Sequence, residues 1–498
     1  MLRTPLPDLD PSADASLAAQ IAGYYAAAIR DGRLRAGERL PPIRVAARAC
    51  AVARTTVQEA YRQLAELGLV EATVGRGTTV CGAGAAPLPD ADAAAVALSP
   101  YALAALRRTQ EMGGAPPLPT GRELVADFAE LAPDGERFPV DEWRAAMDAV
   151  LTRRGAEVLG YGFEPNGHAD LRACIAERMR SIDANAHADD VLVTAGAQQA
   201  LDLVLRTLCA PGDTVLVSDP SYHQMHGLLR AHGLQVASIP FGPEGLDLDQ
   251  LRRHLRRDGV RLCYLMPTFQ NPTGRTLDLA QRHALVEVLA ETSVPVVEDE
   301  YQHSLRFAGE PLPSLRALDP RRRTITVATF SKELFPALRI GWVHADHDLL
   351  AAMAAVKRFM DLETSPLLQA ALVEFLRRGS LDRHLDDLRA ELRTRHAALR
   401  AACARHLPAE CTWTEPDGGF VAWLELPEPG MGDRLCELAV QRGVRVVPGR
   451  LFDLHARPSR GVRLCLARAG VPEIEAGVAV LGAAAHELLG AAAARPFL

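Results

Sequence analysis

The sequence predicts an α/β protein in which a large unit, residues 120–498, has a mainly parallel sheet covered by helices on both faces. A small helical unit precedes it. The first reason is length, because 498 residues are too many for one hydrophobic core. The second is order, because short β-rich runs alternate with helix-length segments such as 277–291. The apolar runs are 191–196, 214–220, 261–267, 294–300 and 324–330.

The rest of the chain divides by composition. Residues 1–14 are polar and rich in proline, which predicts a flexible tail. Residues 15–80 form the small unit. Residues 81–119 are rich in Ala, Gly and Pro, which predicts a linker with one short helix near Tyr101–Arg108. Residues from about 390 to 498 are expected to form a small α+β subdomain.

The charge distribution separates the two units. The net charge of −7 excludes a uniformly basic coat for nucleic acid. Residues 15–80, however, contain nine arginines against five acidic residues, a balance of +4, so the rest of the chain carries −11. A small basic unit on an acidic body is typical of a nucleic-acid reader joined to another domain.

The small unit contains a helix-turn-helix pattern. A first helix ends before Gly32, a second spans about Ile43–Cys50, and a third begins at Thr55 after the turn Ala-Val-Ala. In such a motif the second of two short helices presents its N-terminal residues to the major groove of DNA. Two strand-like runs in 69–80 flank Gly-Arg-Gly, which predicts a hairpin with Arg76 at its tip.

This segment resembles the winged helix-turn-helix of the GntR family. The resemblance is carried by Gly-x-Leu-x-x-Gly-x-x-Leu-Pro at 32–41, by Arg-x-Thr-Val-x-x-Ala-Tyr at 54–61 and by the glycine wing. It implies binding to a DNA operator, with Ile43 departing from the serine usual in the family. The alternative is a helical bundle that binds no nucleic acid. The implied DNA contacts are Arg44, Arg54, Thr55, Thr56 and Arg76.

Of the 55 basic residues only two are lysine, Lys332 and Lys357. Codon bias explains abundant arginine, but arginine cannot replace a lysine whose amine must lose its proton and act as a nucleophile. Lys332 directly follows a strand, between the hydroxyls of Thr329 and Ser331 and the phosphate-pairing Arg339. Lys357 has no such neighbours and is expected on a helix surface, where arginine would serve equally well.

Three upstream features complete a site for pyridoxal 5'-phosphate (PLP). Asp299 ends a buried strand and can keep a pyridine nitrogen protonated. Asn271 can bond the phenolic oxygen of the ring. Gly196-Ala197-Gln198 lies where a strand gives way to a helix, whose first N–H groups bind phosphate. All of these lie near the carboxyl ends of predicted strands, where open α/β sheets bind ligands.

The series resembles the fold-type I PLP enzymes of the aspartate aminotransferase superfamily over about 120–485. The resemblance implies PLP held as a Schiff base on Lys332, with Tyr222 stacked on the ring and Tyr301 on its phenolic oxygen. It also implies a homodimer in which Arg463 binds the effector's or substrate's carboxylate and Tyr161 reaches the partner's site. The implied cofactor contacts are Ala197, Gln198, Tyr222, Asn271, Asp299, Tyr301, Thr329, Ser331, Lys332 and Arg339.

The combination resembles the MocR/GabR subfamily of bacterial transcription regulators. That resemblance implies a cytoplasmic regulator that senses an amine, an amino acid or PLP and adjusts its DNA binding. The member that responds to γ-aminobutyrate has arginine where this chain has Gln224, which argues against that effector. Two alternatives stay open: a working aminotransferase, and a PLP store or sensor without an amine ligand.

Several kinds of site are not expected. The nine cysteines form no Cys-x-x-Cys pair, which predicts reduced thiols and no metal centre. The N-terminus lacks a basic segment followed by an apolar one, so no signal peptide is expected. No apolar run long enough to span a bilayer is expected, and hence no membrane partner.

Overall fold

The computed structural model describes residues 16–30, 34, 38–50, 52–66, 69–73, 77–80, 98–111, 116–119, 121–257 and 259–493. It divides the chain into two compact units, residues 1–98 and 99–498, each described by itself. The predicted tail 1–14 lies outside the described residues, as does the first part of the predicted linker.

The small unit is a three-helix bundle with a two-stranded hairpin. Its elements are α1 (Leu17–Arg30), α2 (Ile43–Ala49), α3 (Arg54–Glu66), β1 (Val70–Thr73) and β2 (Gly77–Val80). Val57, Tyr61 and Leu64 on α3 are buried in its core, as their helical spacing predicts. The Tyr61 hydroxyl donates to the Pro41 carbonyl at 2.7 Å, which fixes α3 against the segment entering α2.

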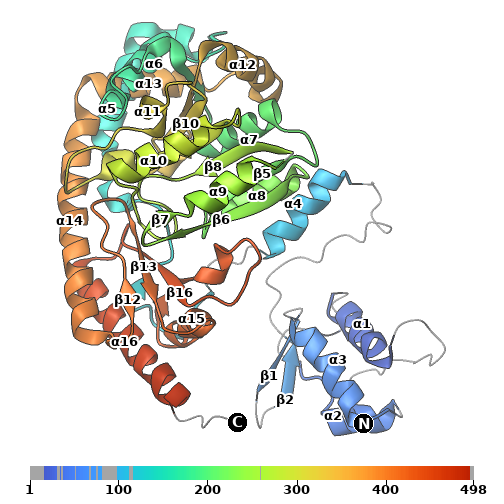
Figure 1. Cartoon of the computed structure of the whole chain (residues 1–498). Helices are drawn as coiled ribbons and strands as arrows, with labels where there is room; N and C mark the ends of the chain where they lie inside the picture. The colour runs from blue at the N-terminus through green and yellow to red at the C-terminus, as the bar shows by residue number, and fades with distance from the viewer. Residues whose placement is uncertain are drawn as a thin grey trace. The chain divides into compact units, whose positions relative to one another are not determined.

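The large unit is built on an eight-stranded sheet (Figure 1). The strand order is β4-β11-β10-β9-β8-β5-β6-β7, and the adjacent pairs from β10 to β6 are parallel. This confirms the mainly parallel sheet, but β11 runs antiparallel between β10 and β4 and was not expected. The strands are β4 (Val191–Thr194), β5 (Thr214–Asp219), β6 (Gln235–Gly242), β7 (Gly245–Leu246), β8 (Val260–Leu265), β9 (Val296–Asp299), β10 (Thr324–Thr329) and β11 (Gly341–His344).

Helices cover both faces of this sheet because successive strand residues point to opposite sides. Val215 and Val217 pack in one core with α7, α8 and α12, whereas Leu216 packs in another with α9, α10 and α11. The helices are α5 (Val140–Arg154), α6 (Ala169–Met179), α7 (Ala197–Leu208), α8 (His223–Ala231), α9 (Leu248–Leu255), α10 (Leu279–Ala290), α11 (Leu315–Leu318), α12 (His347–Asp361) and α13 (Pro366–Arg377).

The helix expected in the linker is present as α4 (Pro100–Glu111). It belongs to the large unit and lies beside α8 (Figure 1). The Tyr101 ring meets His232 edge-on, with centroids 5.6 Å apart, and the Arg206 guanidinium lies 6.0 Å from the Tyr101 centroid. The described part of the linker is therefore anchored next to the helix that follows Tyr222.

The C-terminal subdomain contains a four-stranded sheet in the order β12-β13-β16-β15. An earlier segment also contributes, because β3 (Ala126–Asp127) pairs with β14 (Val444–Arg445). The other elements are β12 (Thr412–Trp413), β13 (Val421–Glu425), β15 (Val447–Pro448), β16 (Gly461–Cys465), α14 (Ser380–His406), α15 (Met431–Gln441) and α16 (Val471–Ala493).

The sequence was expected to contain no segment able to span a bilayer. Judged by length and composition alone, this expectation is wrong. Within α16, Val471–Ala491 is long and apolar enough, with mean hydropathy 1.3. Its position in the fold explains this composition, because α16 packs against α14 and α15. Ile474, Val478 and Leu481 are fully buried in the core of the subdomain, so these apolar residues face protein.

Candidate cofactor site

One cavity of about 150 Å³ lies at the carboxyl ends of β8, β9 and β10 and at the start of α7. The sequence placed ten residues around a cofactor, and all ten line this cavity. Leu131, Leu201 and Met266 add apolar surface that the sequence analysis did not anticipate. The predicted lining residues are Ala197, Gln198, Tyr222, Asn271, Asp299, Tyr301, Thr329, Ser331, Lys332 and Arg339.

Lys332 follows β10 and enters the cavity, where its amine donates to the Leu131 carbonyl at 2.6 Å. Burial lowers the pKa of this amine to about 8, and the positive charges of Arg463 and Arg339 act in the same direction. A much larger fraction of the amine is therefore neutral at physiological pH than for an exposed lysine. Only the neutral amine can attack a carbonyl carbon.

Asp299 ends β9 and is buried. The Tyr264 hydroxyl donates to Oδ2 at 2.7 Å, while Oδ1 makes no hydrogen bond of normal geometry with any described residue. Burial raises the pKa of the carboxyl to about 7, and the bond from Tyr264 opposes that shift. A protonated ring nitrogen is the group that such an oxygen lacks, and its positive charge would favour the ionised carboxylate. The site thus fits a pyridine ring.

The turn between β4 and α7 fits a phosphate group. Gly196 precedes α7 with φ +93° and has no side chain that could cap the helix. The first N–H groups of α7 therefore receive no hydrogen bond from the side chain of the N-cap residue. A Cβ atom there would lie 2.7 Å from Nη2 of Arg339, which donates to the Ala195 carbonyl at 3.0 Å. Glycine is therefore needed both for the backbone angle and for the approach of the guanidinium.

Two more of the predicted residues, Tyr301 and Arg463, are hydrogen-bonded to other parts of the chain. The Tyr301 hydroxyl donates to the Phe269 carbonyl at 3.0 Å. Arg463, on β16, is buried just behind Asn271 and donates to its Oδ1 at 3.4 Å and to the Ala129 carbonyl at 2.6 Å. Arg463 does not line the cavity itself, but its Nε has no partner among the described residues.

The other predicted residues lie elsewhere. Tyr161 is 66% exposed and does not line the cavity of its own chain. Within the small unit Arg44, Arg54 and Thr55 are exposed and Thr56 is half-buried, all on α2 or at the start of α3. Helix α3 begins at Arg54, one residue before the predicted start. Arg76 lies outside the described residues.

Two parts of the site were missed or misread from sequence. Tyr264 stands on β8 beside Asp299, and only the adjacency of β8 and β9 reveals their contact. Lys357 was expected on a helix surface, but it is 3% exposed and its amine bonds Asp361. The helical spacing explains this, because Lys357 continues the buried stripe of Leu350, Met353 and Ala354 along α12.

Two different protein families match the two units of the chain. Residues 17–80 match the bacterial regulatory proteins of the gntR family, and residues 127–481 match aminotransferase class I and II. An HTH-type transcriptional regulator of Escherichia coli, YdcR, is 31% identical over 89% of this chain and 93% of its own length. The chain belongs to the MocR-type regulators, which join these two domains. The probable rhizopine catabolism regulatory protein MocR of Rhizobium meliloti is 30% identical over 92% of this chain and 91% of its own.

The large unit of this MocR-type regulator also resembles solved enzymes. The α-aminoadipate aminotransferase LysN of Thermus thermophilus, solved with N-(5'-phosphopyridoxyl)-L-leucine, is 34% identical. The match has a TM-score of 0.68 and covers 74% of this chain and 93% of LysN. The family and these relatives establish PLP as the cofactor, in agreement with the fit of Asp299 and Lys332.

Proposed function

We propose that this MocR-type regulator holds PLP in the cavity described above and uses it to sense an amino acid. The observation that carries the proposal is one cavity containing a buried lysine with a lowered pKa, an aspartate oxygen with no hydrogen-bond partner among the described residues, and the start of α7. Lys332 would bind the cofactor's aldehyde carbon, Asp299 its ring nitrogen and the α7 turn its phosphate. When bound, PLP supplies an electron sink for bonds at the carbon bearing an amine.

The other residues would orient the cofactor and the effector. Tyr222 would stack on the ring, while Tyr301 and Asn271 would bond its phenolic oxygen. An effector's carboxylate would bind Arg463, whose planar guanidinium suits a carboxylate, and its amine would take the place of the Lys332 amine. The residue at 224 is glutamine, which favours an effector other than γ-aminobutyrate. Thr329, Ser331, Arg339, Ala197 and Gln198 would surround the phosphate.

The residues that would contact DNA belong to the small unit. Arg54, Thr55 and Thr56 form the first turn of α3, the part of a recognition helix that meets base edges. Arg44 on α2 and Arg76 in the wing would bind phosphates of the operator. Because the full-length relatives are bacterial transcription regulators, we place this chain in the cytoplasm.

We expect one amino acid or amine to change both the cofactor spectrum and the DNA affinity of the PLP-loaded protein. The measurement is absorbance together with anisotropy of a labelled DNA fragment from upstream of its own gene. Both signals should follow the same concentration dependence, since coupling is reciprocal, with an affinity change of about 5- to 150-fold. The Arg54→Ala control should lose DNA binding and keep the spectral response. A spectral response that never alters DNA affinity would contradict the regulatory role.

A second candidate, an active aminotransferase, is favoured by the completeness of the cavity. A 2-aminoadipate transaminase of Thermus thermophilus is 35% identical over 74% of this chain. Steady transfer between an amino acid and a keto acid, unchanged when residues 1–80 are deleted, would support this function. A protein whose cofactor responds to no amine would instead act as a PLP store or sensor.

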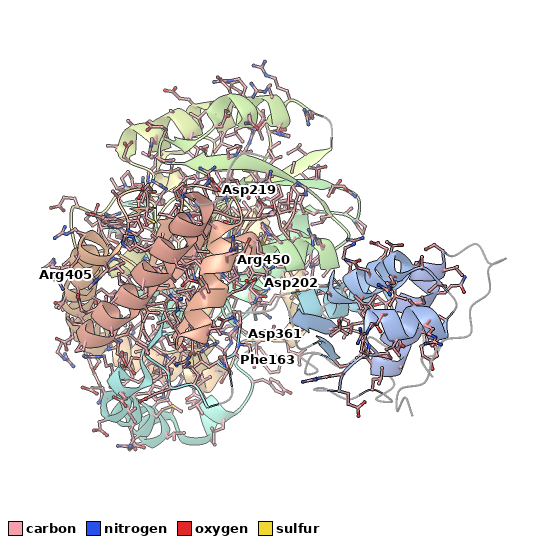
Figure 2. The ribbon with its side chains drawn as sticks, turned by 90° about the horizontal axis from the view of Figure 1, so that it is seen from below. Phe163, Asp202, Asp219, Asp361, Arg405 and Arg450 are labelled. Atoms are coloured by element: carbon pink, nitrogen blue, oxygen red, sulfur yellow. The ribbon has the colours of Figure 1, made fainter. Side chains whose placement is uncertain are left out.

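The exposed apolar surface at the end of α12 suits a homodimer. The Tyr161 and Phe163 rings are in contact, tilted by 35° with centroids 5.2 Å apart, and the Glu363 carboxylate accepts from the N–H groups of Gly162 and Phe163. Phe359, 92% exposed, lies in the last turn of α12, which ends at Asp361. Figure 2 labels Phe163 of this surface and Asp361, the last residue of α12. In a dimer Tyr161 would reach the partner's site, as the resemblance to the aminotransferase superfamily implies.

Sedimentation is therefore expected to give a dimer at micromolar concentration. Phe359→Asp should shift the protein toward monomer without lowering its melting temperature in the monomeric state, because the Phe359 side chain contacts mostly solvent in one chain. A wild-type monomer under these conditions would contradict the dimer.

A further inference from the structure

The second lysine of the chain is buried and paired. Lys357, near the end of α12, donates to both carboxylate oxygens of Asp361, at 2.9 and 3.2 Å. The lysine side chain is 4% exposed and the aspartate side chain 24%. A pair so shielded is costly to separate, because removing one partner leaves the other charge without compensation.

The pair is connected to the turn before α7. Gln199 donates its amide N–H to Oδ2 of Asp361 at 2.7 Å, and its amide oxygen accepts the N–H of Ala195 at 2.7 Å. Only one orientation of the Gln199 amide satisfies both partners, because a carboxylate only accepts and a backbone N–H only donates. A continuous chain of hydrogen bonds thus connects the Lys357 amine to the Ala195 N–H through the side chains of Asp361 and Gln199.

Both backbone polar groups of Ala195 are hydrogen-bonded to side chains. Its N–H bonds Gln199, and its carbonyl accepts from Arg339 at 3.0 Å. The next residue, Gly196, has φ +93°, an angle that glycine adopts without strain. The ammonium of Lys357 also neutralises the Asp361 carboxylate, which would otherwise repel an anion bound at the start of α7.

We propose that Lys357 is a positioning residue for the cofactor phosphate. Acting through Asp361 and Gln199, it holds the Ala195–Gly196 turn in the conformation that presents the first N–H groups of α7. The inference depends on the proposed placement of the phosphate at this turn. It also replaces the expectation that arginine could stand at 357, because the buried position has no room for the wider guanidinium.

The test compares PLP with pyridoxal, which has the same aldehyde and ring but no phosphate. Lys357→Met should weaken PLP by about tenfold or more, the effect of one lost charge-assisted hydrogen bond, and should leave pyridoxal affinity nearly unchanged. Both affinities are measured by absorbance titration of the full chain. Equal losses for the two ligands, or no loss for PLP, would overturn the proposal.

Gln199→Met provides a second measurement if Lys357→Met does not fold. It breaks the connection and leaves the Lys357–Asp361 pair intact, so it should produce the same selective loss of PLP. In the double variant the loss should be smaller than the two single losses combined, because both changes interrupt the connection through Gln199. Additive losses would overturn the proposal. If wild-type protein binds PLP no better than pyridoxal, the placement of the phosphate fails instead.

Discussion

Lys332→Ala is expected to abolish the visible absorbance that the protein acquires with PLP, at every cofactor concentration. Lys332 is one of two lysines in the chain, and its amine is the one that enters the cavity. Alanine cannot form a Schiff base, and the guanidinium of a neighbouring arginine cannot replace the amine. Absorbance titration of the full-length variant makes the measurement, and its response of DNA affinity to amines should disappear as well.

The wild-type protein contains an internal control for this prediction. Borohydride reduction of the PLP-loaded protein followed by peptide mass analysis should place one phosphopyridoxyl group on the peptide containing Lys332 and none on that containing Lys357. The rate of attachment should rise as pH increases through about 8, because the amine is protonated and unreactive below its lowered pKa. A label on Lys357, or a rate that rises only near the pKa of an exposed lysine, would contradict the role of Lys332.

The central strands and the residues that line the cavity could be predicted because two independent patterns coincide. Buried parallel strands are continuous apolar runs, and Asp299 and Lys332 stand at or just after the ends of two such runs. The carboxyl ends of parallel strands meet at one edge of a sheet, so residues far apart in sequence had to converge there. The cavity contains all ten of them.

Other features depend on contacts that a sequence pattern does not contain. Strand β11 is four residues long, and nothing in its composition shows that it runs against its neighbours. The carbonyl acceptor for Lys332 comes from Leu131, 201 residues away. The burial of Lys357 was detectable in principle, because Asp361 stands one helical turn away on the same face of α12. Lysine is so commonly exposed, however, that an acidic residue four positions away does not by itself predict burial.

Asp299→Asn is expected to weaken PLP by about ten- to hundredfold, because a hydrogen bond to a charged group is replaced by one between neutral groups. The amide keeps the shape of the carboxylate and can still accept from Tyr264. It cannot compensate the positive charge of a protonated ring nitrogen. Absorbance titration measures the loss. An unchanged affinity would show that Oδ1 does not contact the ring nitrogen.

Two comparisons separate this effect from general damage to the fold. A PLP analogue with carbon in place of the ring nitrogen should bind wild-type protein more weakly than PLP, whereas Asp299→Asn should hardly distinguish the two.

The cofactor-free variant should also melt no lower than wild type at pH 8. Burial raises the pKa of Asp299 in the folded state to about 7, so its stabilising contribution is present at low pH and is lost as pH rises toward that value. At pH 8 the wild-type protein contains an ionised, buried carboxylate, and the amide removes that charge. A variant that binds PLP less tightly yet melts no lower would identify Asp299 as a residue retained for the cofactor at the expense of the stability of the empty site.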